Sequence, residues 1–540
     1  HWISLNRKYL NLSKMIVENN IQKISLLSVV KKILHLALLT AIFINFNSCS
    51  DITDLNEDPN QSQEVNPELL FKYAVKRGMG NYITQSHLEY NGIQQWMMYM
   101  GTRGGVENGN EYVQPSTAES FWNESYIDAM NNAQKVIDIT ATDINLQNKK
   151  AAALVWKTFI ISRITDLWGA VPYSQALQGN PELEFTPEYD TQKEIYEKMM
   201  ADLQSAIQLF DPNKPFFSNE NDLIYGGDIN MWISFANSLR LRFAVRIQHI
   251  YPELASTAFE DISNYPLIES NSSNATFLYN TVFNKPLYEA GSIRYEEGSS
   301  YINPSKFLVD LLIDSNDPRT QFYFEKTQLS EIFPFLDEYR GVPNLLSYSS
   351  EEWENYNLDA QLGDPNGEWG DVSRIGNWFM NNDRPFPILT CSEVAFLKAE
   401  ASLSGNWAGN TKNLFEEGVT NHIDYINQYA FDEEPITQIE LNNYLNQFST
   451  ISLADIITQK YVLFAFENVF EAYNDYRRTG FPILVDFYGD PINQDNFPQR
   501  LVYPFTEYTY NRGNYLNAIA LQGPDELTTR FWWNTNGAKR

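Results

Sequence analysis

The chain has 540 residues and a formal net charge of −29, and 43% of its residues are hydrophobic. This hydrophobic fraction excludes a chain that is disordered throughout, and the length allows several domains of about 100–200 residues or one large domain. A strongly acidic surface repels the phosphate backbone, so nucleic acid is not expected as a partner.

Residues 31–51 have the pattern of a bacterial secretory signal that ends in a lipidation site. A Lys-Lys pair precedes an almost wholly apolar run at 33–46, and Asn-Ser-Cys-Ser-Asp follows at 47–51. A membrane span needs about 20 apolar residues, and shorter runs after a basic pair are typical of signal peptides. We therefore expect residues 1–48 to be a signal peptide with an upstream extension, and Cys49 to carry a lipid. A transmembrane helix and a buried core helix are the alternatives.

The segment 49–66 is polar and aperiodic, which predicts a lipidated tether. Its acidic start, Asp-Leu-Asn-Glu-Asp at 54–58, is similar to the start of a calcium loop. Pro59 stands where such a loop needs Gly, which excludes an EF-hand. If Cys49 carries lipid, Cys391 has no disulfide partner, and we expect a small buried residue there.

Apolar residues recur at helical spacing through 67–264 and 391–480, which predicts a helical scaffold. Thr191 with Glu194 three residues later forms a capping-box pattern at a helix start. In the first stretch we predict helices over 67–100, 116–140, 149–168, 191–210 and 228–250, with Pro252 ending the last. In the second stretch we predict helices over 391–403, 410–429, 440–447 and 452–476. Residues 481–540 are expected to form loops.

Residues 265–390 differ from both stretches because Pro, Gly, Asn, Ser and aromatic residues dominate them. We predict one helix at 305–313 and one strand at 275–283. A long irregular insertion in a compact protein is usually functional or disordered, and its aromatic density favours order. The predicted fold is mainly α, with helix pairs, this loop-rich insertion and few short strands. The helix starts do not keep the period of about 34 residues of tetratricopeptide repeats, so such repeats would be degenerate.

No motif for catalysis, a metal or a cofactor is present. Three of the five histidines follow Cys49, and none of His87, His249 and His422 lies at zinc-ligand spacing to another. The chain has no Gly-x-Ser-x-Gly elbow and no glycine-rich phosphate loop. The acidic residues leave a glycosidase pair possible, but no local pattern points to one. We therefore predict a protein that is not an enzyme and has no metal site or cofactor.

Aromatic residues of the insertion are the candidate ligand contacts. A flat ring can stack on the apolar face of a sugar while neighbouring polar groups bind its hydroxyls. The alternative is that these rings pack the insertion onto the helices. The candidates are Trp353, Tyr356, Trp369, Trp378, Tyr288, Tyr295 and Tyr301.

Eight segments carry a likeness to a known family. They lie at 54–60, 121–126, 164–176, 232–244, 316–319, 341–344, 392–401 and 475–482, and include Ile-Thr-Asp-Leu-Trp-Gly at 164 and Asp-Tyr-Arg-Arg-Thr-Gly-Phe-Pro at 475. Together and in this order they resemble the SusD/RagB family of nutrient-binding outer-membrane lipoproteins from Bacteroidota. The resemblance runs from the signal to the C-terminus.

The resemblance implies a mostly α fold with four tetratricopeptide-like helix pairs and an irregular ligand-binding face. It implies a lipid anchor in the outer membrane at the cell surface, and the capture of nutrients, usually glycans. The implied partner is a SusC-like TonB-dependent transporter, over which the lipoprotein acts as a lid. Some members hold a calcium ion. Ligand residues are not carried by motifs in this family, so no site residue is transferred.

Three functions thus remain open from the sequence. The first is a surface binding protein for a glycan, or for a peptide instead. The second is a surface glycoside hydrolase. The third is a helical-repeat adaptor that binds only protein, which would bury the Trp and Tyr rings of the insertion.

Overall fold

Capping residues and apolar stripes begin most helices where the sequence predicts them. In the computed structural model, α9 (Gln192–Leu209) follows the predicted capping box: Thr191 Oγ1 accepts from the Glu194 amide at 3.3 Å, and Glu194 Oε2 accepts from the Thr191 amide at 2.8 Å. Helix α19 (Cys391–Leu403) spans the predicted residues and is capped by Thr390. Cys391 is buried, as predicted, and burial raises the pKa of its thiol to about 12.

The structure describes the chain from residue 66 onward, and residues 66–540 cluster as one unit. The described residues are 66–79, 88, 92–102, 112–178, 186–279, 302–347, 349–362, 371–381, 384–430 and 433–534. The predicted signal peptide, Cys49 and the predicted tether lie outside them.

The N-terminal part of the scaffold is a set of helices packed in sequence-adjacent pairs. Helix α8 packs on both α7 and α9, and α10 packs on both α9 and α11. Residues on nearly every side of α8 and α10 are buried, so these two helices are central. The elements are α3 (Pro67–Gly78), α5 (Gln94–Trp96), α6 (Ala118–Asn123), the π-helix η4 (Glu124–Met130), α7 (Asn131–Ile139), η5 (Ile144–Leu146), α8 (Gln147–Trp168), α9, α10 (Ile229–Ile247) and α11 (Pro252–Ile262).

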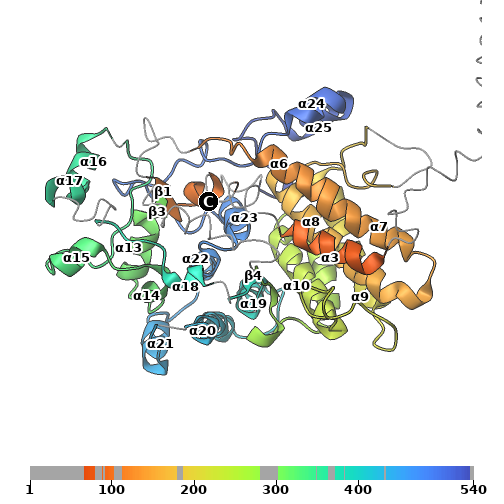
Figure 1. The fold of residues 1–540 in the computed structure, drawn as a ribbon, viewed down its shortest axis with the longest axis horizontal. Coiled ribbons are helices and arrows are strands. Elements are labelled where there is room, and N and C mark those ends of the chain that lie inside the picture. The colour runs from red at the N-terminus through yellow and green to blue at the C-terminus, as the bar shows by residue number, and fades with distance from the viewer. Residues whose placement is uncertain are drawn as a thin grey trace, which may run out of the picture. The chain divides into compact units, whose positions relative to one another are not determined.

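The C-terminal part of the scaffold adds a second set of helices against α10. Helix α19 packs on α20, α22 and α10. Figure 1 shows α3 and α7 to α10 gathered together, α13 to α18 on the other side, and α19, α20, α22 and α23 between them. The elements are α19, α20 (Thr411–Gln428), α21 (Gln438–Leu445), α22 (Leu453–Phe464), α23 (Val469–Thr479), α24 (Phe505–Tyr510), α25 (Arg512–Gln522) and η7 (Trp532–Asn534).

The insertion contains short helices and contributes strands to two small antiparallel sheets. Strand β1 (Met100–Thr102) pairs with β3 (Ile302–Pro304), and β2 (Ala275–Phe277) pairs with β4 (Phe386–Leu389). Strand β2 lies within the predicted strand, and α13 (Lys306–Asp314) matches the predicted helix. The remaining elements are η6 (Asn271–Ser273), α14 (Thr320–Tyr323), α15 (Gln328–Ile332), α16 (Glu351–Tyr356), α17 (Leu358–Leu362) and α18 (Asn377–Met380). The prediction of a mainly α fold with few short strands is confirmed.

Several predicted boundaries are wrong. The helix predicted over 452–476 is two helices, α22 and α23, because Phe466 adopts a positive φ of 64° between them. Pro252, which the sequence predicts to end a helix, begins α11, since the first helical turn tolerates a residue without an amide hydrogen. The preceding helix, α10, ends earlier, at Ile247. The tail, predicted as loops, contains α24 and α25.

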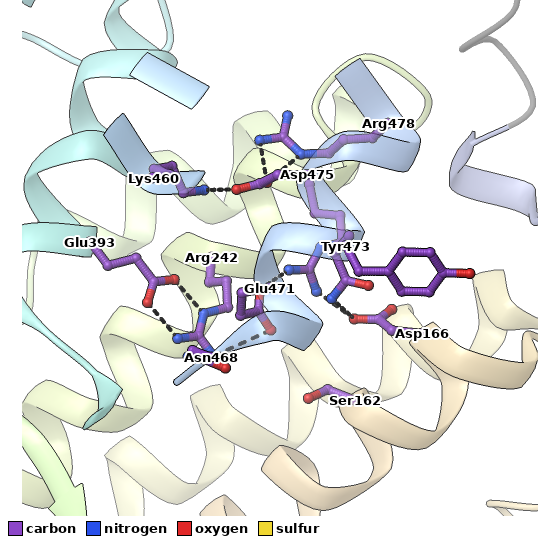
Figure 2. Close-up of polar contacts among 12 residues, drawn as sticks. Ser162, Asp166, Arg242, Glu393, Lys460, Asn468, Glu471, Tyr473, Asp475 and Arg478 are labelled. Carbon is purple, nitrogen blue, oxygen red and sulfur yellow. Dashed lines mark hydrogen bonds and ion pairs between the residues drawn. The ribbon is translucent and has the colours of Figure 1, made fainter. Parts of the chain in front are cut away.

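A buried ionic network joins helices that are distant in sequence (Figure 2). Arg242 on α10 binds Glu393 on α19 through two contacts of 2.7 Å. Arg246, one turn later, pairs with Glu471 on α23 and with Asp166 on α8, the latter at 2.5 Å. Four of the segments that carry the family likeness supply residues to this network and to a second buried cluster, centred on Asp475, that lies next to it. These segments are 164–176, 232–244, 392–401 and 475–482. These motifs therefore specify the scaffold.

The neighbouring cluster has Asp475 at its centre. Its carboxylate lies 2.6 Å from Lys460 Nζ and 2.7 Å from Arg478 Nη2, and Arg478 also binds Glu400. Figure 2 shows Lys460 and Arg478 approaching Asp475 from opposite sides. Burial raises the pKa of Asp475, but the two cations more than offset this and lower it to about 2.

This lowered pKa predicts acid destabilisation. Because the unfolded carboxyl has a pKa near 3.8, the unfolded state binds more protons than the folded state between pH 3.8 and about 2. The stabilisation is complete above this window and is lost as the pH falls through it, by about 2 kcal/mol. Denaturant unfolding of the wild type and Asp475→Asn at each pH measures it. The difference between the two unfolding free energies should shrink as the pH falls, and a constant difference would contradict the assignment.

Among the described residues, no helix is long and apolar enough to cross a membrane.

Candidate binding pocket

A pocket of about 490 Å³ opens on the insertion, beside α13 and the loop at 485–489. This volume is in the range of small-molecule sites, about 300–1,000 Å³. Its walls combine two phenyl rings with several carboxylates. The lining includes Lys306, Phe307, Asp310, Pro343, Asp486 and Phe487.

Ser305 fixes the start of α13 in the pocket wall. Its hydroxyl caps the helix by accepting from the Leu308 amide at 3.0 Å, and it donates to the carbonyl of Met98. The Ser305 amide donates to the carbonyl of Tyr99 at 3.0 Å. Ser305 therefore joins α13 to the segment before β1, and it sets the direction in which Phe307 and Asp310 project.

Gly341 allows the opposite wall to approach α13. A Cβ atom at this position would lie 2.3 Å from the carbonyl carbon of Ser305, so no other residue fits without a backbone shift. The neighbouring Val342 donates to the Pro304 carbonyl and accepts from the Lys306 amide, each at 2.8 Å. Gly-Val-Pro-Asn at 341–344 thus positions Pro343 and Asn344 in the lining.

The two aromatic walls are supported from behind. The Phe307 ring packs edge-on against the buried ring of Tyr461, with centroids 5.9 Å apart. The Phe487 ring packs edge-on against Tyr356 at 6.0 Å and also contacts the small cluster around Trp353. Both phenyl rings are half-buried, so each retains exposed surface. Supported rings lose little conformational freedom when a ligand stacks on them.

Charged groups lie beside the rings. Lys306 and Asp310 form an ion pair one turn apart on α13. Burial raises the pKa of Asp310, although Lys306 opposes the shift. Asp314 and Asp486 also line the pocket. Carboxylates accept hydrogen bonds from hydroxyl groups, so the arrangement suits a ligand that is apolar on its faces and hydroxylated at its edges.

Three of the seven predicted contact residues lie in the described part of the chain. Trp378 is buried: its indole donates to the Ile426 carbonyl at 3.1 Å, and the Arg384 guanidinium lies 3.9 Å from its ring centroid. Trp353 is buried in the cluster below Phe487. The burial of these two indole rings indicates packing rather than ligand contact. Tyr356 is half-buried, and it supports the pocket without lining it.

The other four candidates, Trp369, Tyr288, Tyr295 and Tyr301, lie outside the described residues. Phe307 and Phe487 were missed by the sequence reasoning. Phe307 falls in the predicted helix, where an aromatic residue is expected to face the core, and Phe487 falls in the predicted loops. A feature of the sequence that could have indicated these two rings is a carboxylate close to each one: Asp310 near Phe307, and Asp486 next to Phe487.

We expect Tyr356 to stabilise the pocket wall without contacting the ligand. Its hydroxyl donates to the Gly341 carbonyl at 2.6 Å, so Tyr356→Phe should lower the free energy of unfolding by about 0.5–1.5 kcal/mol and leave ligand affinity unchanged. Thermal and denaturant unfolding measure the first effect, and calorimetric titration the second. Tyr510→Phe, at a residue that is 76% exposed, is the matched control. A large loss of affinity in Tyr356→Phe would instead make this residue a ligand contact.

Within the described ranges, no group of three or more His, Cys, Asp or Glu side chains is arranged to hold a metal ion.

Comparisons with known proteins agree with this architecture. The model of a SusD-like family, described as starch-binding and associating with the outer membrane, matches residues 59–504. A solved structure named as a chitin-binding protein is 26% identical, covers 87% of this chain and 100% of its own, and has a TM-score of 0.73. A comparison with curated protein sequences found no significant match.

Two further solved structures share the fold. A SusD homologue from Bacteroides fragilis is 22% identical over 87% of this chain and 100% of its own, with a TM-score of 0.71. A chitin-binding SusD homologue from Flavobacterium johnsoniae is 23% identical over 87% and 98%, with a TM-score of 0.67. Since the family model spans most of the chain and the helical scaffold is shared, the chain belongs to the SusD-like family.

Proposed function

We propose that this protein binds oligosaccharides at the cell surface through the pocket beside α13. The observation that carries the proposal is the pair of supported, half-buried rings of Phe307 and Phe487 next to the carboxylates of Asp310 and Asp486. Sugar rings offer apolar faces to aromatic side chains and hydroxyl groups to carboxylates. The family's description and the chitin-binding relative support a glycan over a peptide.

Calorimetric titration against chito-, malto- and cello-oligosaccharides, with a mixed peptide library as the comparison, tests this proposal. Saturable binding of at least one oligosaccharide class is the expected result. Binding of peptides alone, or of nothing, would contradict it. Each oligosaccharide is recovered after incubation and sized, because release of shorter products would favour the surface hydrolase instead.

The lid role rests on the family and on the N-terminal sequence. Lipid on Cys49 would confine the protein to the outer membrane and raise its effective concentration beside a SusC-like TonB-dependent transporter. The polar tether would allow the binding unit to move over that partner. Residues 66–534 would then capture the ligand and present it to the transporter.

Cys49→Ala should remove the protein from the membrane fraction. A single lipid-bearing residue supplies the proposed anchor, so its loss leaves the binding unit in the soluble fraction with unchanged ligand affinity. Fractionation and immunoblotting of the native host measure this, and Cys391→Ala is the matched control. Co-purification of a TonB-dependent transporter with wild-type protein tests the partnership. Membrane retention of Cys49→Ala would contradict the anchor.

A further inference from the structure

A second pocket lies away from the one beside α13, between the start of α9, helix α25 and the segment 530–532. Its volume is about 440 Å³, and it opens to solvent past the exposed residues Asn517 and Leu521 of α25. Tyr189 and Trp532 contribute aromatic surface to it. Nothing in the proposed function uses this pocket.

The walls of this pocket are held by specific contacts. Gln522 on α25 accepts from the Ala170 amide at 2.7 Å and donates to the Trp168 carbonyl at 3.0 Å. The Tyr189 hydroxyl donates to Glu507 at 2.5 Å. The Trp532 ring packs against the ring of Tyr196, with centroids 6.0 Å apart. The pocket is therefore a built feature of the scaffold.

Two buried polar atoms of the lining residues are unpaired. Gln192 is 2% exposed, and its Nε2 donates to the Thr165 carbonyl, but its Oε1 has no hydrogen-bond partner among the described residues. Nη2 of Arg530 is also buried, and it has no hydrogen-bond acceptor among the described residues. A buried polar group without a hydrogen-bond partner is destabilising, so each of these two atoms is expected to have a partner.

One unpaired atom is an acceptor and the other is a donor, which restricts the ligand. A carboxylate only accepts, so it would suit Arg530 but would meet Gln192 Oε1 and the carboxylate of Glu188, which also lines the pocket. An ammonium only donates, and it would meet the Arg530 guanidinium. A hydroxyl group both donates and accepts, so a neutral ligand with several hydroxyl groups satisfies both atoms.

We propose that this pocket is a second binding site for a neutral, hydroxyl-rich ring of monosaccharide to disaccharide size. Gln192 Oε1 accepts from one hydroxyl, Arg530 donates to another, and Trp532 offers apolar surface to the ring. The site is independent of the pocket beside α13, so it stands whether or not that pocket binds the main ligand.

The test uses the full chain with Phe307→Ala and Phe487→Ala, so that the first pocket does not contribute. Saturation-transfer NMR titrations compare methyl β-glucoside with glucuronate and glucosamine. In this background, Asn517→Trp places a bulky ring at the mouth of the second pocket, and Ala520→Trp places one on the same helix at an exposed residue outside the lining. Circular dichroism confirms that each variant is folded.

We expect methyl β-glucoside to bind more tightly than either charged probe, and Asn517→Trp to weaken it about tenfold or more while Ala520→Trp leaves it unchanged. Arg530→Met should also weaken the binding of methyl β-glucoside, and this variant tests the site if Asn517→Trp fails to fold. The proposal is overturned if methyl β-glucoside does not bind, if a charged probe binds equally well, or if the two tryptophan variants bind alike.

Discussion

Glu471→Gln should lower the free energy of unfolding by about 3–5 kcal/mol. Its carboxylate lies between two arginines of α10, contacting Arg246 and lying 3.6 Å from Arg242. All three side chains are at least nine-tenths buried. Removing the negative charge leaves two guanidinium groups in the interior with less compensation, which costs far more than the loss of an exposed pair. Equilibrium unfolding in urea measures the change.

Glu416→Gln is the control for this prediction. Glu416 pairs with Lys412 at 3.6 Å on the surface of α20, where both side chains are more than a third exposed. Solvent screens this pair, so the same chemical change should cost less than about 0.5 kcal/mol. Equal effects of the two substitutions on the free energy of unfolding would contradict the claim that Glu471 compensates the buried charges of Arg242 and Arg246.

Replacing both Phe307 and Phe487 with alanine should abolish measurable oligosaccharide binding at the pocket beside α13 while the protein stays folded. Stacking on one aromatic ring is worth about 1–3 kcal/mol in the nearest measured analogue, the stacking of nucleic acid bases on aromatic side chains. Loss of both rings would therefore weaken a micromolar ligand into the millimolar range or beyond. Each single variant should show an intermediate loss, measured by calorimetric titration.

Phe333→Ala with Phe335→Ala is the matched control. These two rings contact each other, with centroids 5.8 Å apart, and Phe335 is 78% exposed, but neither lines the pocket. Their removal should leave affinity unchanged. If the control pair weakens binding as much as the pocket pair, the ligand site is not the pocket beside α13.

The sequence predicted the scaffold well because local signals agree with the packing. Thr191 and Glu194 form the expected capping box, and Cys391 begins a helix whose sides are nearly all buried. The missed helices lack such a signal. In α25 only Ala518 is buried, so no apolar stripe marks it. Between α22 and α23, Ala465 and Phe466 are both buried, so the apolar pattern continues across a break that only the backbone reveals.

The binding pocket could not be predicted in the same way. Phe307 and Phe487 are far apart in sequence, and the close approach at Gly341 and the packing of Tyr356 bring their walls together. Aromatic composition alone does not distinguish a ring that lines a pocket from one that packs. Trp378 satisfied every compositional criterion, yet Arg384 covers its ring and Ile426 accepts its indole hydrogen.

The most direct test is a crystal structure of the protein with the tightest-binding oligosaccharide from the titration panel. The account predicts a sugar ring against Phe307 and Phe487, with a hydroxyl group hydrogen-bonded to Asp310 or Asp486. An oligosaccharide seen only elsewhere on the protein, with the pocket beside α13 empty at saturating concentration, would contradict it.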